Sequence, residues 1–342
     1  MTRKPQKPAK PFRSSGGGAP PRPPERARGE MIFDRPELLR QLFGQYDENL
    51  IALENRLGVA IAARGERVSI EGPASDVARA RDVLEHLHAR LKSGGPLDLG
   101  DVEGAIHLAA EPHLAGLTLP DHSSPIVIRT RKKTIVPRSP TQIRYMEALA
   151  SEDLIFALGP AGTGKTYVAV AQAVQQLIAG SVDKLILSRP AVEAGEKLGF
   201  LPGDMKDKVD PYLRPLYDAL HDMLPAEQVE RRMAAGEIEV APLAFMRGRT
   251  LANAFIILDE AQNATVPQTK MFLTRFGMGS RMVVCGDPRQ TDLPAQTPSG
   301  FNDAVGRLEG VDGIATIRFS AADVVRHPLV GRIVQAYEGE DA

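Results

Sequence analysis

Eight consecutive residues, Gly159–Thr166, form the segment of the chain best suited to binding phosphate. They match the pattern G-x-x-x-x-G-K-[ST] in full. In that pattern backbone N–H groups surround the phosphates, the lysine places its charge on the β- and γ-phosphates, and the final hydroxyl ligates Mg²⁺. We therefore expect Lys165 to be catalytic and Thr166 to bind the metal. The residues expected to bind the nucleotide are Gly159, Pro160, Ala161, Gly162, Thr163, Gly164, Lys165 and Thr166.

Two adjacent carboxylates, Asp259 and Glu260, follow the apolar run 255–258. A carboxylate that ends a buried strand beside a phosphate loop holds the hydration shell of Mg²⁺, and this is the role expected for Asp259. Glu260 is placed to orient and deprotonate a water molecule for in-line attack on the γ-phosphate. Water needs such a group because nothing else positions it. The pair therefore favours a hydrolase over a small-molecule kinase.

A third polar group, Gly286–Gln290, follows another apolar run that ends at Cys285. Gln290 could accept a hydrogen bond from the attacking water or donate one to the γ-phosphate, whereas a plain turn is the alternative. Cys285 is the only cysteine, so an intrachain disulfide and a cysteine-based zinc cluster are excluded. Its apolar neighbours indicate a small buried residue rather than a nucleophile.

Strands alternate with helices from Ile126 onward, which is typical of an α/β fold with a doubly wound parallel sheet. The carboxyl ends of parallel strands share one edge of the sheet, so the three polar groups should meet there. The expected strands are Leu154–Leu158, Lys184–Ser188, Phe255–Asp259, Met282–Cys285 and Ile314–Phe319. Residues 125–342 are assigned to this domain, and residues 93–124 are expected to be a linker around one short helix.

Residues 31–92 are expected to form a small α/β domain in the order βααββα. That order is typical of a KH-like RNA-binding module. A KH module clamps the backbone of its ligand with a Gly-x-x-Gly loop between its two helices. The corresponding turn here, 43–47, contains only Gly44. A domain that serves only for packing is therefore the alternative.

The first 30 residues carry eight Lys and Arg, two Glu and seven prolines. Such a segment buries too little apolar surface to offset its ordering entropy, so we expect a disordered tail. It could bind phosphate backbones or only improve solubility. Tryptophan is absent and aromatic residues make up 5% of the chain, so no base-stacking platform stands out. No apolar run is long enough to cross a membrane, and we expect a cytoplasmic protein.

The phosphate loop, Asp259–Gln262 and Gly286–Gln290 together resemble the ATPase core of superfamily 1 helicases. With 187–204 and 242–250 added, residues 31–338 are similar to the PhoH family. This resemblance implies a P-loop NTPase core of the RecA-like kind, with ATP as substrate and Mg²⁺ as cofactor. The segment 139–142 is similar to the helicase Q motif, in which Gln142 would contact the edge of adenine.

The resemblance also implies assembly into a ring-shaped homo-oligomer, commonly a hexamer. In such rings an arginine from one chain reaches the nucleotide of the next, and Arg326 fits that role as a catalytic residue, with an exposed helix cap as the alternative. Arg189, Arg247 and Arg249 lie in family-specific segments and are expected to contact phosphate or the partner chain. This chain has room for a single nucleotide-binding lobe, so a neighbour must complete the site.

The function expected from these features is ATP hydrolysis coupled to binding, unwinding or remodelling of RNA during RNA or ribosome maturation. The family resemblance makes an rRNA-processing endoribonuclease an expected partner. The alternative is a regulatory or assembly ATPase without an RNA substrate.

Overall fold

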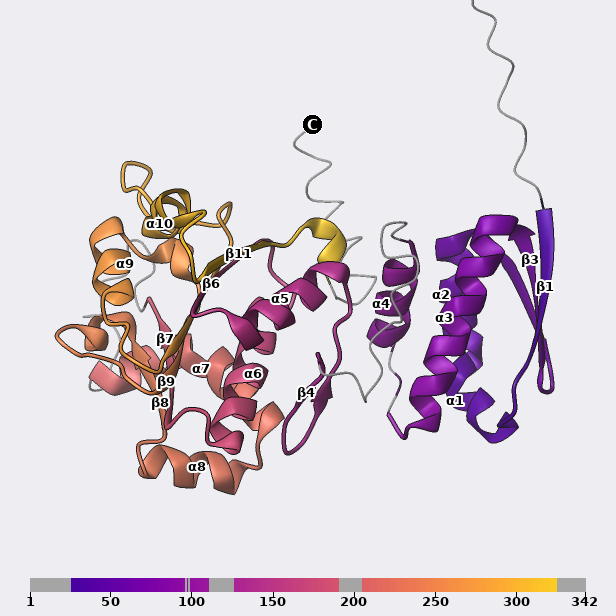
Figure 1. Ribbon diagram of the computed structural model, residues 1–342, viewed down its shortest axis with the longest axis horizontal. Coiled ribbons are helices and arrows are strands. Elements are labelled where there is room, and N and C mark those ends of the chain that lie inside the picture. The colour runs from indigo at the N-terminus through magenta and orange to yellow at the C-terminus, as the bar shows by residue number, and fades with distance from the viewer. Residues whose placement is uncertain (1–25, 96, 98, 111–125, 191–204, 325–342) are drawn as a thin grey trace, which may run out of the picture.

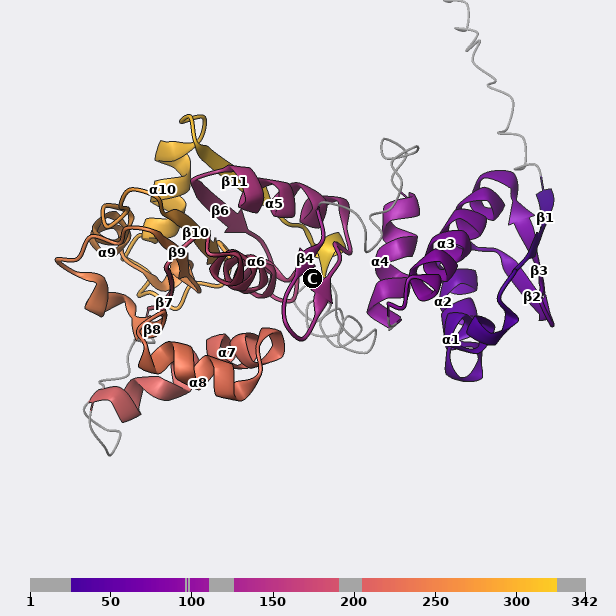
Figure 2. The ribbon, with the colours of Figure 1, turned by 60° about the horizontal axis from the view of Figure 1, so that its bottom comes forward.

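The computed structural model describes residues 26–95, 97, 99–110, 126–190 and 205–324. Two units, each built around its own sheet, lie along the long axis of the molecule (Figure 1). Both views place helix α4 (Leu99–Ala110) between them (Figure 1, Figure 2). The expected disordered tail lies outside the described residues as far as residue 25.

The N-terminal unit has the expected order of strands and helices. An antiparallel sheet in the order β1-β3-β2 packs against helices on one face. In the sequence, α1 and α2 lie between β1 and β2, and α3 follows β3. The elements are β1 (Arg26–Ile32), η1 (Pro36–Leu38), α1 (Leu39–Phe43), η2 (Gln45–Asp47), α2 (Glu48–Leu57), β2 (Ala60–Arg64), β3 (Arg67–Pro73) and α3 (Ala74–Lys92).

Strand β1 begins at Arg26, five residues before the domain boundary expected at residue 31. It pairs with β3 along its whole length, from Arg26 opposite Pro73 to Ile32 opposite Arg67. Its inner face carries Ala27, Gly29 and Met31, while charged residues alternate on the exposed face. Because of its charged residues, this segment had the composition of the expected tail. Its small inner residues nevertheless let the strand pack closely on α3, because a Cβ at Gly29 would lie 3.0 Å from Val77.

Helix α4 belongs to the core of the N-terminal unit and is not a linker helix. Val102, Ala105 and Ile106 are buried in the same apolar cluster as residues of α2 and α3. The glycines and prolines around this helix made the segment resemble a linker, although the apolar face of the helix is buried. Residues 111–125 of the expected linker lie outside the described part of the chain.

The larger unit contains a six-stranded parallel sheet in the order β11-β6-β10-β9-β7-β8. This confirms the expected P-loop NTPase architecture. The five expected strands are present. The sixth, β8, was not predicted because Glu239 and Pro242 interrupt its apolar pattern. The strands are β6 (Leu154–Leu158), β7 (Lys184–Arg189), β8 (Ile238–Pro242), β9 (Ala254–Leu258), β10 (Arg281–Gly286) and β11 (Ile314–Arg318).

Helices cover both faces of this sheet and enclose two apolar clusters. One face packs against α5 (Pro140–Ser151), α6 (Lys165–Ala179), α7 (Met205–Met223) and α8 (Ala226–Ala234). The other packs against η5 (Leu243–Met246), η6 (Ala261–Asn263), α9 (Val266–Leu273) and α10 (Gly300–Leu308). The two-stranded hairpin β4 (Ile128–Arg129) and β5 (Thr134–Ile135) precedes α5, and η7 (Ala321–Asp323) follows β11. None of the helices in the described ranges combines the length and the apolar character needed to cross a bilayer.

Candidate active site

The loop between β6 and α6 is shaped by glycines that no other residue could replace without movement. Gly164 precedes α6 in a left-handed conformation with φ of 83°, a region that favours glycine. Gly159 has φ of 143°, and a Cβ there would lie 2.6 Å from Phe319 at the end of the neighbouring strand β11. The loop therefore turns directly into α6, whose first N–H groups face the same space as the loop.

Lys165 lies inside the loop rather than in solvent. Its Nζ donates hydrogen bonds to the carbonyl oxygens of Gly159 at 2.6 Å and Pro160 at 2.9 Å. The residue is 8% exposed, and burial lowers the pKa of its amine. These bonds place the charged amine of Lys165 at the centre of the loop. Phosphate oxygens would replace the two carbonyl oxygens as its partners there.

Thr166 and Asp259 bring the first two motifs into direct contact. The Thr166 hydroxyl donates to Asp259 Oδ1 at 2.5 Å, although the two residues come from α6 and from the end of β9. Burial raises the pKa of the Asp259 carboxyl, and the hydrogen bond from Thr166 opposes this shift. Two oxygen ligands beside a phosphate loop suit Mg²⁺, which binds through one or two protein oxygens and substrate phosphates. The residues present therefore fit the metal.

Glu260 adopts a strained backbone conformation, with φ of 50° and ψ of 39°. A non-glycine residue in this region costs about 1–3 kcal/mol and persists where the surroundings hold it. Here its carboxylate accepts a hydrogen bond from Gln262 Nε2 at 2.5 Å and lies 3.5 Å from Arg189 Nη2. The side chain remains 40% exposed, so the carboxylate is fixed in place yet accessible to water.

A cavity of about 530 Å³ opens in front of the loop and joins the three motifs. Gln290 lines it, and the backbone N–H of this residue donates to Asp287 O at 3.2 Å. The structure thus brings five of the expected catalytic and metal-binding residues around one space. They are Lys165, Thr166, Asp259, Glu260 and Gln290.

Gln262 has a part in this site that the sequence reasoning missed. Its Oε1 accepts from the backbone N–H of Asp287 at 3.0 Å, while its Nε2 donates to Glu260. The residue is 2% exposed. It therefore ties the second motif to the third and orients the Glu260 carboxylate. The sequence does hold a signal for this role, because Gln262 is the fourth residue of the motif Asp259–Gln262. We assigned no separate role to that position.

Gln142 lies at the start of α5 and contacts the loop from the other side. Its Oε1 accepts from the backbone N–H of Arg138 at 2.7 Å, and its Nε2 donates to Thr163 O at 3.0 Å. A side-chain amide can make four hydrogen bonds, so an N–H and a lone pair remain beyond these two. The expected contact with adenine stays a prediction.

The arginines singled out from the sequence have different surroundings. Arg189 pairs with Glu260, whereas Arg249 forms a bidentate pair with Glu239 at 2.6 and 2.7 Å. Arg249 is therefore used to hold the edge strand β8, and Arg247 is exposed. Arg326 lies outside the described residues, as does the segment 191–204.

Comparisons with known proteins identify related chains. The family model for PhoH-like proteins matches residues 134–338, more than half of the chain. A PhoH-like protein of Bacillus subtilis (strain 168) is 48% identical over 306 residues, which cover 90% of this chain and 96% of that protein. A PhoH-like protein of Mycobacterium tuberculosis (strain ATCC 25618 / H37Rv) is 49% identical over 306 residues, with 88% and 85% covered. Protein PhoH of Escherichia coli (strain K12) is 46% identical over 205 residues, with 59% and 58% covered.

Cys285 lies directly behind the loop and is buried, as expected. Its Sγ is 3.7 Å from the hydroxyl of Tyr145, which donates to the carbonyl oxygen of Lys165 at 3.0 Å. Burial raises the pKa of the Cys285 thiol to about 12. We predict that iodoacetamide at pH 8 leaves the folded protein unmodified and labels it fully in guanidinium chloride, because only an exposed thiolate reacts. Mass spectrometry reads a single site, and rapid labelling of the folded chain would contradict the burial.

Proposed function

The chain belongs to the PhoH family of ATP-binding proteins, and on this basis we propose that it is a Mg²⁺-dependent ATP hydrolase. The observation that carries the proposal is the contact between Thr166 and Asp259, with Glu260 beside it on the same cavity. Thr166 and Asp259 would hold Mg²⁺, and the bound ion would supply positive charge to the β- and γ-phosphates.

Each remaining group then has a defined task. Lys165 would bind the phosphate oxygens, since its amine already lies at the centre of the loop. Glu260 would take the proton of the attacking water, and Gln262 would keep that carboxylate oriented. Gln290, which lines the same cavity, would contact the γ-phosphate or the water. A metabolite kinase needs no carboxylate held in a strained conformation for water, so hydrolysis explains the arrangement better.

Replacement of Glu260 by Gln tests this assignment. The amide keeps the size and the contacts of the side chain but cannot accept a proton, so kcat for phosphate release should fall about 100-fold or more. The Kd for ATP should stay within about twofold, because the interaction lost belongs to the transition state. Glu227→Gln, at an exposed position in the first turn of α8, is the matched control. Turnover in Glu260→Gln at the rate of the control would refute the role of Glu260.

We further propose that hydrolysis is coupled to RNA, and an exposed aromatic residue supports this. Tyr46 is 90% exposed and has φ of 55°, in the loop 44–47 between α1 and α2. Asn49 anchors the start of α2 through a hydrogen bond to Leu42 O at 3.0 Å. An exposed ring on a loop fixed in this way suits stacking with an unpaired base. Composition alone had suggested that the chain offers no such platform.

Arginines lie close to this loop. Arg40, Arg64 and Arg67 line a shallow cavity of about 590 Å³ between α1 and the turn joining β2 to β3. Phe43, the last residue of α1, also lines it and leads directly into the loop of Tyr46. Positive charge beside an exposed ring is the combination that binds single strands, with arginines on phosphates and the ring on a base.

Tyr46→Ala should weaken the binding of single-stranded RNA. One stacked base contributes about 1–3 kcal/mol, so Kd should rise about 5- to 150-fold in filter binding across a salt series. Phe245→Ala, which removes a ring that is 57% exposed on the larger unit, is the matched control. Binding that is unchanged in Tyr46→Ala and depends on residues 1–25 would contradict the proposed contact. No binding at low salt would favour a regulatory ATPase without an RNA substrate.

We also propose that the chain works as a ring-shaped oligomer in which Arg326 of one subunit reaches the nucleotide of the next. The described residues hold a single parallel sheet with one phosphate loop, and Glu260 is partly exposed on its surface. A neighbouring subunit could therefore cover this face.

The specific ATPase activity should rise with protein concentration until the ring is complete. Glu260→Gln and Arg326→Ala should each be inactive alone, but a mixture of the two should recover activity, because one interface then contains both intact residues. Activity that is independent of concentration, together with a mixture that remains inactive, would rule out a shared site.

A further inference from the structure

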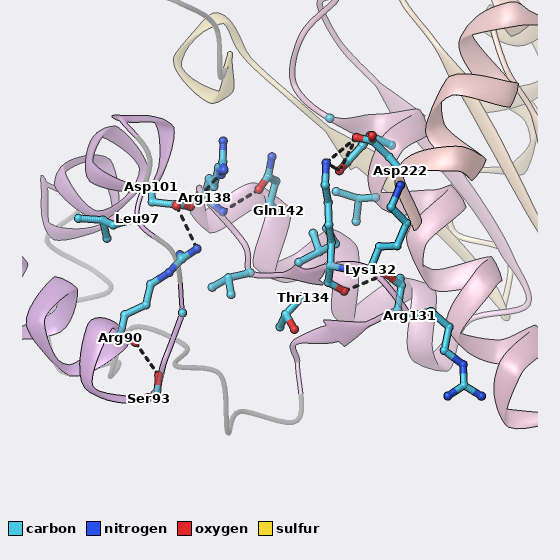
Figure 3. Close-up of a pocket in the computed structure, with 18 of the residues that line it drawn as sticks. Arg90, Ser93, Leu97, Asp101, Arg131, Lys132, Thr134, Arg138, Gln142 and Asp222 are labelled. Atoms are coloured by element: carbon cyan, nitrogen blue, oxygen red, sulfur yellow. Dashed lines mark hydrogen bonds and ion pairs between the residues drawn. The ribbon is translucent and has the colours of Figure 1, made fainter. Parts of the chain in front are cut away.

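A second, larger cavity of about 920 Å³ lies between the two units (Figure 3). The larger unit contributes the β4–β5 hairpin, residues 130–136, together with the start of α6. The N-terminal unit contributes the end of α3 and the residues that follow it, including Ser93 and Leu97, and also Asp101 of α4. The cavity is thus formed only when both units are present.

This cavity is continuous with the phosphate cavity around the loop. Gly162, Gly164, Tyr167 and Asp222 line both. A nucleotide whose phosphates lie against Lys165 and Thr166 would leave the loop past Gly162 and Gly164. Its nucleoside would then enter the space between the two units.

The lining of the larger cavity suits a nucleoside. Ile135, Val136 and Val168 give it apolar surface, and the half-buried ring of Tyr167 lies on the same side. Gln142 adds a side-chain amide to the lining. The volume lies within the range of about 300–1,000 Å³ that small-molecule sites occupy. Polar and charged side chains share the walls with the apolar ones, and among them are the cationic groups of Arg131 and Arg138.

The hairpin that forms one wall is held firmly by the larger unit. Lys133 bonds to Asp222 at 2.6 Å and lies 5.9 Å above the ring of Tyr167. The neighbouring Lys132 donates to the carbonyl oxygen of His221 at 2.6 Å. Tyr167 also donates to Asp222 at 3.3 Å, so the ring has a fixed position.

A buried ion-pair cluster holds the N-terminal unit at the other wall. Asp101, whose side chain is 4% exposed, lies 3.0 Å from Arg90 of α3 and 3.1 Å from Arg138 of the larger unit (Figure 3). Gly104 permits this approach, because a Cβ there would lie 2.9 Å from Arg138. The backbone of Arg138 in turn holds Gln142, which bonds to Thr163 of the loop.

From this geometry we propose that the N-terminal unit completes the nucleoside half of the ATP site. The proposal rests on ATP binding at Gly159–Thr166. The phosphates bind to the larger unit alone, whereas the base and ribose lie between the hairpin and the end of α3. Binding of ATP therefore depends on the position of the N-terminal unit relative to the larger unit. RNA bound to the N-terminal unit would then change the affinity for ATP.

Titration of the full chain with Mg²⁺–ATP and with Mg²⁺–tripolyphosphate separates the two halves of the site. Ser93→Trp places a bulky side chain on the exposed end of α3, and Thr134→Trp places one on the exposed hairpin. Each should weaken ATP binding about tenfold or more by filling the cavity, while the Kd for tripolyphosphate stays within about twofold. Ala78→Trp, exposed on the same helix α3 but outside the cavity, should leave both constants unchanged.

Two outcomes would overturn this inference while sparing the proposed function. One is wild-type protein that binds ATP no more tightly than tripolyphosphate. The other is a pair of variants, folded by circular dichroism, that both bind ATP like the wild type. Failure of the wild-type protein to bind either ligand would instead overturn the proposed function, and this inference with it.

Discussion

The hydrogen bond between Thr166 and Asp259 is the contact on which the rest of the site depends. Strand β6 leads into the loop before Thr166, and strand β9 leads into Asp259. The two strands are not neighbours, because β10 lies between them. The register of β10 with both strands sets how far each motif projects, with Gly286 opposite Leu158 and Val284 opposite Leu258. A buried carboxylate is costly without a partner. The threonine hydroxyl supplies one, and a bound cation would supply another.

Two further links extend from this contact. On one side, Gln262 bonds to Glu260 and to the backbone of Asp287, so it links the second motif to the third. On the other side, Gln142 connects the loop to Arg138 and through it to Asp101 of the N-terminal unit. The site is therefore part of a set of polar contacts that begins at the loop and ends at helix α4 of the N-terminal unit.

The sequence predicts the parts of this arrangement that depend on local pattern. The phosphate loop, five strands and Asp259 follow from spacing and apolar runs, because a strand and the turn after it are specified by adjacent residues. Tyr46 and Asp101 were missed for the opposite reason. The exposure of Tyr46 depends on a backbone angle of one loop residue. Asp101 pairs with Arg90 on the preceding helix α3 and with Arg138, which follows Asp101 by 37 positions. Likewise, alternating charges concealed the first five residues of β1.

Release of inorganic phosphate from ATP by the purified full chain tests the central claim most directly. We expect release to require Mg²⁺, to stop when the metal is chelated, and to be lost in Lys165→Ala, whose folding circular dichroism can verify. Phosphate release from Lys165→Ala at the wild-type rate, or from wild-type protein without a divalent metal, would contradict it.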